Sequence, residues 1–343
     1  MVHEINFAGF LDRDLPLIDV RSPGEYAKGH IPGAVNIPLF SDTERAHVGT
    51  LYTQVSREKA MEVGYALVNP KLETFLIKSR EVAPDGKVAV HCWRGGMRSQ
   101  AFARHLDEHG FEEVFCLTGG YKAYRNHILD FFNSPFKLNI LGGYTGSGKT
   151  KIIRYLMEKG YQAVDLEEVA RHKGSAFGAL GQELQPSQEQ FENDLFDAFR
   201  KLDVSLPIWL EDESHNIGGV TIPLNLYQRM LPSPVYFLEI PREARAENLV
   251  EEYALFAPEL LAEAITRISR RLGGQNTKTA LHYLGNRDFY ELALVILTYY
   301  DKAYLKGLRL HDPGQVFPIR GDSTDTVKNA NIILITYVKL FGN

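Results

Sequence analysis

Residues 138 to 151 read L-N-I-L-G-G-Y-T-G-S-G-K-T-K, an apolar segment followed by a glycine-rich turn and the start of a predicted helix. Four of them have the spacing G-x-x-x-x-G-K-T, which is typical of a phosphate-binding loop, or P-loop. Glycines let successive backbone N–H groups turn toward an anion, and the following helix adds the positive end of its dipole. The lysine adds a mobile charge and the threonine a hydroxyl for magnesium. We therefore expect a phosphate site made by Gly143, Gly146, Ser147, Gly148, Lys149 and Thr150.

Acidic side chains follow two further predicted strands. Residues 161–164 lead into Asp165, and residues 207–210 lead into Glu211 and Asp212. A carboxylate after such a strand can hold magnesium or its water beside Thr150, as a second P-loop motif does. The sequence favours that role for Glu211 or Asp212 without choosing between them. Asp165 fits a substrate-facing role and a helix-capping role equally well. Mg²⁺ is the one cofactor that these residues suggest, and no motif requires it.

A second loop combines a thiol with two arginines. Residues 87–91 predict a strand that leads into Cys92-Trp93-Arg94-Gly95-Gly96-Met97-Arg98 and then into a helix from Ser99. Inward N–H groups and the positive end of that helix favour a thiolate, and Arg94 and Arg98 add positive charge. We predict that Cys92 is a nucleophile at the base of an anion-binding loop. Cys116 lies within the apolar segment E-V-F-C-L, so we expect it to be core packing.

Basic side chains gather at two further places. Arg171 and Lys173 belong to R-H-K-G-S-A-F-G, a predicted surface loop near the phosphate site. Arg267, Arg270 and Arg271 have the spacing i, i+3, i+4 and share one face of a predicted helix. Such a face could meet the phosphates of a polynucleotide or of a bound diphosphate. An ordinary solvated surface explains both groups equally well.

Composition limits the class of protein. The chain has 343 residues, of which 44% are hydrophobic and 24% charged, as in soluble globular proteins with two domains. No apolar run is long enough to cross a membrane, and the first residues lack a secretory signal, so we expect a cytoplasmic protein. Two cysteines argue against a disulfide framework. A net charge of -5 neither indicates nor excludes nucleic-acid binding.

Strands alternating with helices in both halves predict an α/β protein with parallel sheets. We place an N-terminal domain with the active cysteine loop at residues 1–132. A short linker follows, and a P-loop domain occupies residues 136–343, with a helical insertion at about 242–310.

Three motifs give the first half a resemblance to rhodanese domains: D-V-R-S-P-G-E-Y-x-x-G-H-I-P-G-A-x-N-I-P, H-C-W-R-G-G-M-R-S and L-T-G-G-Y-K-A-Y. In that family the cysteine carries sulfur as a persulfide, a role that the resemblance gives to Cys92, while Asp19, Arg21, His30 and Gly33 belong to the scaffold. The loop between Cys92 and Ser99 is one residue longer than in ordinary rhodanese domains, and its C-x5-R spacing is similar to that of cysteine phosphatases. Its length could suit a donor with a phosphate group better than thiosulfate.

The complete chain resembles the tRNA 2-selenouridine synthase family through both loops and through D-L-E, R-H-K-G-S-A-F-G, Q-P-S-Q-x-x-F-E, W-L-E-D-E-S-x-x-I-G and R-R-L-G-G-Q. The resemblance implies a transferase that replaces sulfur by selenium at the 2-position of a wobble uridine in tRNA, with selenophosphate as the selenium donor. It also implies S-geranylation from geranyl diphosphate, so that the P-loop holds a diphosphate and need not hydrolyse ATP.

Two other classes share single features of this chain. A P-loop kinase with a rhodanese-like regulatory domain would turn over ATP in a reaction that depends on Lys149. A cysteine phosphatase fused to a nucleotide-binding module would release phosphate from phosphoesters through Cys92 and would have no use for tRNA.

Overall fold

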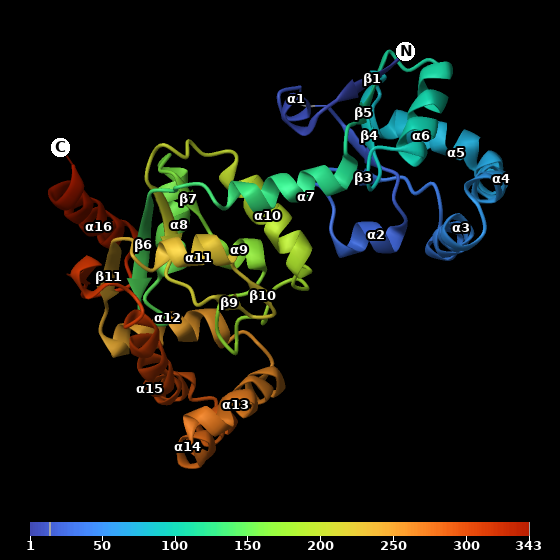
Figure 1. Cartoon of the computed structure of the whole chain (residues 1–343). Helices are drawn as coiled ribbons and strands as arrows, with labels where there is room; N and C mark the ends of the chain where they lie inside the picture. The colour runs from blue at the N-terminus through green and yellow to red at the C-terminus, as the bar shows by residue number, and fades with distance from the viewer. Residues whose placement is uncertain (14, 343) are drawn as a thin grey trace. The chain divides into compact units, whose positions relative to one another are not determined.

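A computed structural model describes residues 1–13 and 15–342 of the chain (Figure 1). The chain divides into two compact units, Met1–Phe131 and Phe132–Asn343. Each unit has its own five-stranded sheet, and all strand pairs of both sheets are parallel. Helices connect the strands, as parallel pairing requires. The α/β class with a parallel sheet in each half is therefore confirmed.

The first sheet has the strand order β1-β5-β4-β2-β3. Its strands are β1 (Val2–Ile5), β2 (Leu17–Asp19), β3 (Val35–Asn36), β4 (Lys87–His91) and β5 (Glu113–Leu117). The helices of this unit are α1 (Phe7–Leu11), α2 (Pro23–Lys28), α3 (Asp42–Gln54), α4 (Arg57–Val68), α5 (Leu72–Val82), α6 (Met97–Glu108) and α7 (Gly120–Phe131), with a 3₁₀ turn η1 (Asn69–Lys71).

Local sequence signals set several of these boundaries. Ser22 and Glu25 form a capping box at the start of α2, and Pro23 occupies its first turn. The strand expected at residues 87–91 is β4. The β4 side chains Val88, Ala89 and Val90 are fully buried, because helices cover both faces of a parallel sheet.

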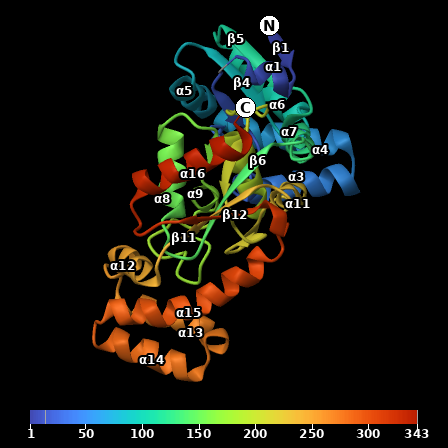
Figure 2. The same ribbon diagram turned by 90° about the vertical axis from the view of Figure 1, so that its left-hand side faces the viewer.

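The second sheet has the strand order β12-β11-β6-β8-β7. It consists of β6 (Leu138–Gly143), β7 (Ala163–Val164), β8 (Ile208–Glu211), β11 (Val235–Glu239) and β12 (Val316–Arg320), and a separate hairpin pairs β9 (Asn216–Ile217) with β10 (Val220–Thr221). Its connecting helices are α8 (Lys149–Glu158), α9 (Leu166–Ala170), α10 (Gln188–Phe199) and α11 (Leu224–Met230). The last helix, α16 (Thr326–Phe341), packs beside α8 (Figure 2).

Four helices separate β11 from β12. They are α12 (Arg242–Tyr253), α13 (Pro258–Leu272), α14 (Gly274–Gly285) and α15 (Phe289–Leu308), and a 3₁₀ turn η2 (Pro313–Gln315) follows them. Helices α13, α14 and α15 pack side by side around a separate apolar cluster that includes Leu261, Ile265 and Leu284 (Figures 1 and 2). In the part of the chain that the structure describes, no helix is both long and apolar enough to span a membrane.

A buried ion pair lies at the end of β2. The Arg21 guanidinium is 1% exposed and donates to both carboxylate oxygens of Asp19, with its shortest contact at 2.6 Å, and also to the carbonyl oxygen of Gly29. The Arg21 guanidinium also lies 3.8 Å from the centre of the Tyr121 ring, just after β5. This pair therefore links the β2 end to the segment that supports the cysteine loop.

We expect Arg21→Ala to destabilise the first unit by about 3–5 kcal/mol, because it leaves the Asp19 carboxylate buried and unpaired. Urea unfolding followed by hydrogen exchange of the β2 and β4 amides would measure the loss. Lys59→Ala is the control: its ion pair with Glu62 is exposed, so its loss should cost about 0.5 kcal/mol. Equal effects of the two variants would contradict the structural role of the buried pair.

Candidate functional site

The loop after β4 wraps around Cys92 and is held in shape by the segment after β5. The N–H of Tyr121 donates to the carbonyl oxygen of Cys92 and the N–H of Lys122 to that of Trp93, both at 2.9 Å. Gly120 has a positive φ of 56°, and an added Cβ would lie 2.3 Å from the carbonyl oxygen of Cys92. The motif L-T-G-G-Y-K thus provides a close backbone contact that only glycine permits.

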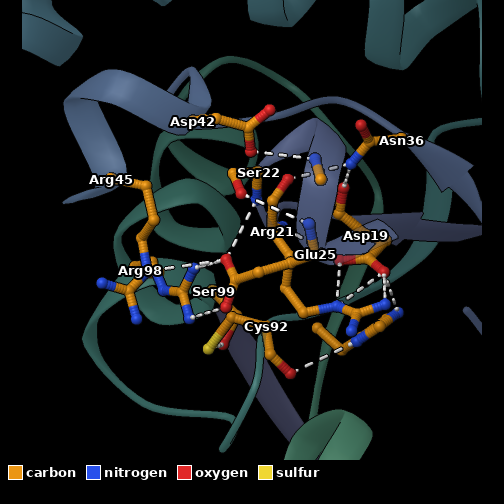
Figure 3. Close-up of polar contacts among 12 residues, drawn as sticks. Asp19, Arg21, Ser22, Glu25, Asn36, Asp42, Arg45, Cys92, Arg98 and Ser99 are labelled. Carbon is orange, nitrogen blue, oxygen red and sulfur yellow. Dashed lines mark hydrogen bonds and ion pairs between the residues drawn. The ribbon is translucent and has the colours of Figure 1, made fainter. Parts of the chain in front are cut away.

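The Cys92 side chain is 3% exposed and lies in the loop between β4 and α6. Its Sγ is 3.3 Å from the Ser99 Oγ (Figure 3). Burial alone would raise the pKa of Cys92, but the Ser99 hydrogen bond, the Arg98 charge and the backbone N–H of Arg94 outweigh it and lower the pKa below its ordinary value. These are the conditions that favour a thiolate nucleophile.

The two arginines of the loop lie in different environments. Arg98 donates to the Glu25 carboxylate at 2.8 Å, and Arg45 approaches the same carboxylate at 3.5 Å (Figure 3). Burial opposes ionisation of Glu25, but Arg98 keeps its pKa below the ordinary value. The Arg94 side chain is exposed, and its backbone N–H is the group that affects Cys92. Of the two guanidinium groups, Arg98 is therefore the one fixed near the thiol.

Cys116 is also part of this hydrogen-bonded group. It is buried in β5 as expected, but its Sγ is 3.3 Å from the Ser99 Oγ, so Ser99 lies within contact of both thiols. Burial raises the pKa of Cys116, which keeps it a neutral thiol. The expectation of core packing alone is therefore incomplete, because register between β4 and β5 brings Cys116 to the cysteine loop.

The phosphate loop follows β6 and leads into α8. Gly148 adopts the left-handed conformation at the start of α8, with φ of 84°. The Lys149 Nζ lies across the loop and donates to the carbonyl oxygen of Gly143 at 2.8 Å. Gly146, Ser147, Gly148, Lys149 and Thr150 all line one cleft of about 400 Å³. Backbone N–H groups, a helix N-terminus and a lysine therefore face a cavity large enough for a diphosphate.

Residues of the helical insertion also form hydrogen bonds with the phosphate loop. Arg245 of α12 is 3% exposed, donates to the carbonyl oxygen of Thr145 at 3.1 Å, and pairs with Asp301 of α15 at 2.8 Å. Asn248 donates to the carbonyl oxygen of Gly146 at 3.2 Å and accepts from Lys151 at 2.7 Å. Sequence reasoning missed these residues, because no short motif marks an arginine about a hundred residues away as a partner of the loop.

Three glutamates, Glu167, Glu211 and Glu213, lie close to Lys149 or Thr150. The Thr150 hydroxyl donates to Glu167 at 3.0 Å. Burial and the neighbouring Glu167 raise the pKa of Glu211 well above its ordinary value, and the same two causes raise that of Glu213 to about 8. Burial raises the pKa of Glu167 as well, although the Lys149 charge opposes it. Crowded carboxyl groups of this kind call for a cation or for protons.

Three carboxyl groups are candidates to hold magnesium: Glu167 and Glu213 line the cleft, whereas Glu211 does not. Glu211 is the most buried of the three. It is 1% exposed, and neither carboxyl oxygen has a partner at normal hydrogen-bond geometry among residues 1–13 and 15–342, while the nearby Thr150 hydroxyl partly offsets the rise in its pKa. An orphaned buried carboxyl next to Thr150 suits a cation that also contacts bound phosphates. No three metal-binding side chains within the described ranges are arranged as a complete site. Magnesium commonly uses one or two carboxylates together with substrate phosphates, so this arrangement is compatible with it.

Asp212 has different partners. Its carboxylate accepts from the Tyr304 hydroxyl and lies 2.9 Å from the His311 Nε2. Tyr304 in turn accepts the Gly143 N–H at 2.9 Å. Burial opposes a charge on His311, but its hydrogen bond to Asp212 raises its pKa above the ordinary value. Asp212 therefore lines the cleft as part of a network with Tyr304 and His311. Of the two residues that the sequence favoured, Glu211 is the one whose carboxyl oxygens are not engaged by other side chains in this way.

Asp165 has the capping role that the sequence left open. Its carboxylate accepts from the Glu168 N–H at the start of α9 and from Arg154 at 2.7 Å. It is not among the residues that line the phosphate cleft. A substrate-facing role for Asp165 therefore receives no support from this geometry.

The basic residues separate into two groups. Lys173 lines the phosphate cleft and lies 3.3 Å from Glu252, whereas Arg171 lies outside the cleft and pairs with the exposed Glu183. Arg267, Arg270 and Arg271 are exposed on α13, and none of them lines the cleft. Arg271 hydrogen-bonds Tyr299 at a separate hollow. Direct diphosphate binding by these three arginines is therefore not supported, and a tRNA contact stays a prediction.

We expect Ser99→Ala to raise the apparent pKa of Cys92 by roughly 1 to 2 units, because a hydrogen bond to a charged group is worth about 1.5–3 kcal/mol. The rate of iodoacetamide alkylation as a function of pH measures this pKa. Both proteins should also carry Cys116→Ala, so that only one thiol reacts. An unchanged pH profile would show that Ser99 does not stabilise the thiolate.

The glutamate cluster predicts a pH-dependent stability of the second unit in the absence of magnesium. The pKa of Glu213 rises on folding from its ordinary value of 4.5 to about 8. Its contribution to stability is thus fully present below about pH 4.5 and is lost as the pH rises through about 8. Glu213→Gln should flatten this dependence and raise the melting temperature at pH 8.5 by at least about 2 °C.

Thermal unfolding in EDTA, with β8 followed by hydrogen exchange, would measure this effect. Glu183→Gln is the control, because Glu183 is 81% exposed and lies outside the cluster. The electrostatic account is wrong if both variants keep the wild-type pH dependence.

Comparison with known proteins gives two family matches. Residues 136–330 match the tRNA 2-selenouridine synthase AAA domain, and residues 7–127 match the rhodanese-like domain. Relatives with the name tRNA 2-selenouridine synthase include one from Pseudomonas syringae pv. syringae, 37% identical over 76% of each chain. One from a Sulfurovum species is 38% identical over 80% of each chain. Another, from Pseudomonas syringae pv. tomato, is 34% identical over 90% of this chain and 94% of its own. With a family domain matched over more than half its length and relatives that align across both units, this chain belongs to the tRNA 2-selenouridine synthase family.

Proposed function

We propose that this protein replaces the 2-sulfur of a wobble uridine in tRNA by selenium, with geranyl diphosphate as the activating alkyl donor and selenophosphate as the selenium donor. The observation that carries the proposal is the presence of two anion-binding loops on one chain. One has a lysine at a phosphate cradle, and the other has a thiol beside a fixed arginine. The names of the relatives support the tRNA substrate and the selenium product.

The phosphate cleft suits the alkylation step. The thiocarbonyl sulfur attacks the first carbon of the geranyl group, a carbon–sulfur bond forms, and the carbon–oxygen bond to the diphosphate breaks. The departing pyrophosphate gains charge, which Lys149 and the N–H groups of the loop can stabilise. Magnesium, held by Glu211 and Thr150, would supply further positive charge at the leaving group.

This step also requires removal of the N3 proton of the thiouracil ring. Asp212 and His311 line the same cleft and are hydrogen-bonded to each other. They are therefore the groups available to accept that proton, directly or through water.

The cysteine loop suits the selenium-transfer step. The selenium of selenophosphate attacks C2, so that a carbon–selenium bond forms while the carbon–sulfur bond breaks and geranylthiolate leaves. The Cys92 thiolate then attacks phosphorus, the selenium–phosphorus bond breaks with selenium left on C2, and water releases the phosphoryl group from Cys92 as phosphate. The loop N–H groups and Arg98 can hold the phosphate oxygens during this transfer. The thioether is a better leaving group than the original thiocarbonyl sulfur, which is the reason for alkylating first.

We expect substitutions in the two loops to block different steps of the reaction. Cys92→Ser should lose selenium incorporation by at least about a hundredfold but retain geranylation, so that geranylthiouridine accumulates. Lys149→Ala should lose geranylation by about a hundredfold, because the pyrophosphate loses its main charge partner. Mass analysis of nucleosides from tRNA treated with each variant separates the two losses.

Lys159→Ala is the control for the lysine variant, since Lys159 is exposed at the far end of α8. Unchanged geranylation and selenation by Lys149→Ala would remove the P-loop from the mechanism. ATP turnover that depends on Lys149, without any modified nucleoside, would instead support a kinase.

A further inference from the structure

A second, apolar recess adjoins the phosphate cleft. It lies between α12, α13 and α15 of the second unit and shares five lining residues with the cleft. The shared residues are Thr145, Ser175, Leu249, Tyr253 and Tyr300, so the two hollows lie directly side by side. The recess begins directly beside the P-loop, because an added Cβ on Gly146 would lie 3.0 Å from the Leu249 side chain.

The polarity of the cavity changes along its length. Lys149, Lys173 and Glu213 lie at the cleft end. Beyond the shared residues, every side chain that lines the recess is apolar, and Phe177, Leu261, Phe289 and Ile296 are among them. A ligand that fills both parts must therefore combine an oxyanion with an apolar tail.

The polar groups where the recess meets the cleft already form hydrogen bonds with other groups of the protein. The Tyr300 hydroxyl accepts the Ala176 N–H at 3.0 Å, and both Tyr300 and Tyr253 hydrogen-bond Ser175. Burial raises the pKa of Tyr300 to about 12, so this hydroxyl stays neutral. A purine base would need partners for its ring nitrogens, and the recess offers none beyond these engaged groups. A hydrocarbon chain needs none.

We propose that this recess binds the prenyl chain of an isoprenoid diphosphate whose diphosphate lies in the P-loop, and that the side chains at its far end set the chain length. This assignment rests on the proposed alkyl-donor function and adds to it the place of the chain. Buried methylene groups contribute affinity roughly in proportion to their number, at about 0.8 kcal/mol each. The recess thus supplies the binding energy that positions the first carbon next to the P-loop.

The recess is held firmly against the loop. Arg245 and Asp301 join α12 to α15 and to the carbonyl oxygen of Thr145, and Thr145 itself lines the recess. The loop and the recess therefore keep one relative position, as a site for a single two-part ligand needs.

Calorimetry in magnesium buffer with inorganic pyrophosphate, geranyl diphosphate, farnesyl diphosphate and ATP tests the proposal. The wild-type protein should bind geranyl diphosphate at least about thirtyfold more tightly than pyrophosphate, because of the buried chain. Ala254→Phe, which fills the recess at the end of α12, should remove at least tenfold of this advantage and leave pyrophosphate affinity within twofold. Retained pyrophosphate binding also shows that the variant is folded.

Two further variants complete the test. Phe289→Ala enlarges the far end of the recess and should improve farnesyl relative to geranyl diphosphate by about tenfold. Ala257→Phe is the matched control, because Ala257 is exposed three residues beyond Ala254 and does not line the recess. It should leave all affinities unchanged.

The proposal is overturned if geranyl diphosphate binds no more tightly than pyrophosphate, or if Ala254→Phe and Ala257→Phe behave alike. It is also overturned if ATP is the ligand whose binding Ala254→Phe removes, since the recess would then hold a nucleoside. Different outcomes would contradict the recess assignment and the proposed function. Geranylated tRNA made equally well by wild type and Ala254→Phe would refute the recess alone, and recess-dependent geranyl binding without any modified nucleoside would refute the function alone.

Discussion

Parallel strands all end at the same edge of a sheet, and the cysteine loop and the P-loop of this protein both depend on that constraint. In the first unit, β2, β4 and β5 deliver Asp19, Cys92 and the glycine pair 119–120 to one edge. In the second unit, β6 and β8 deliver the P-loop and Glu211. Neighbouring strand ends lie about 5 Å apart, so groups far apart in sequence meet without any long side chain reaching across. The helix after each loop then directs its positive end at the anion.

Charged side chains are arranged differently at the edges of the two sheets. Around Cys92 the protein pairs its charges, since Arg21 holds Asp19 and Arg98 holds Glu25. Under the P-loop it leaves carboxyl groups crowded, and the pKa values of Glu167, Glu211 and Glu213 are all raised. Carboxyl groups whose pKa values are raised by burial and by mutual repulsion are stabilised strongly by a bound cation. The charges around the cysteine loop are therefore balanced within the protein, whereas the carboxyl groups near the P-loop are not.

The helical insertion surrounds the P-loop with groups that the parallel sheet alone does not supply. A bare cradle of N–H groups and a lysine is common to many reactions. Here α12 and α15 add Arg245 behind the loop, Tyr304 on the Gly143 N–H, and an apolar recess at the side. These additions come from residues between β11 and β12, which the sheet itself does not need. Specificity for the tail of a ligand can thus change without disturbing the part that binds its phosphates.

The sequence alone determined the features that depend on neighbours along the chain. Both loops, the strand at residues 87–91, the capping box at Ser22 and the α/β class follow from local spacing, apolar pattern and backbone preference. Long-range partners could not be read in this way. Glu25 binds Arg98 from 73 residues away, and Tyr304 and His311 reach Asp212 from 92 and 99 residues away. The cap that Asp165 forms on the Glu168 N–H is local and is one of the two roles that the sequence allows. Only the folded sheets decided that Glu211 is buried without a regular hydrogen-bond partner and that Cys116 touches Ser99, because such contacts depend on strand register and packing that no short stretch of sequence contains.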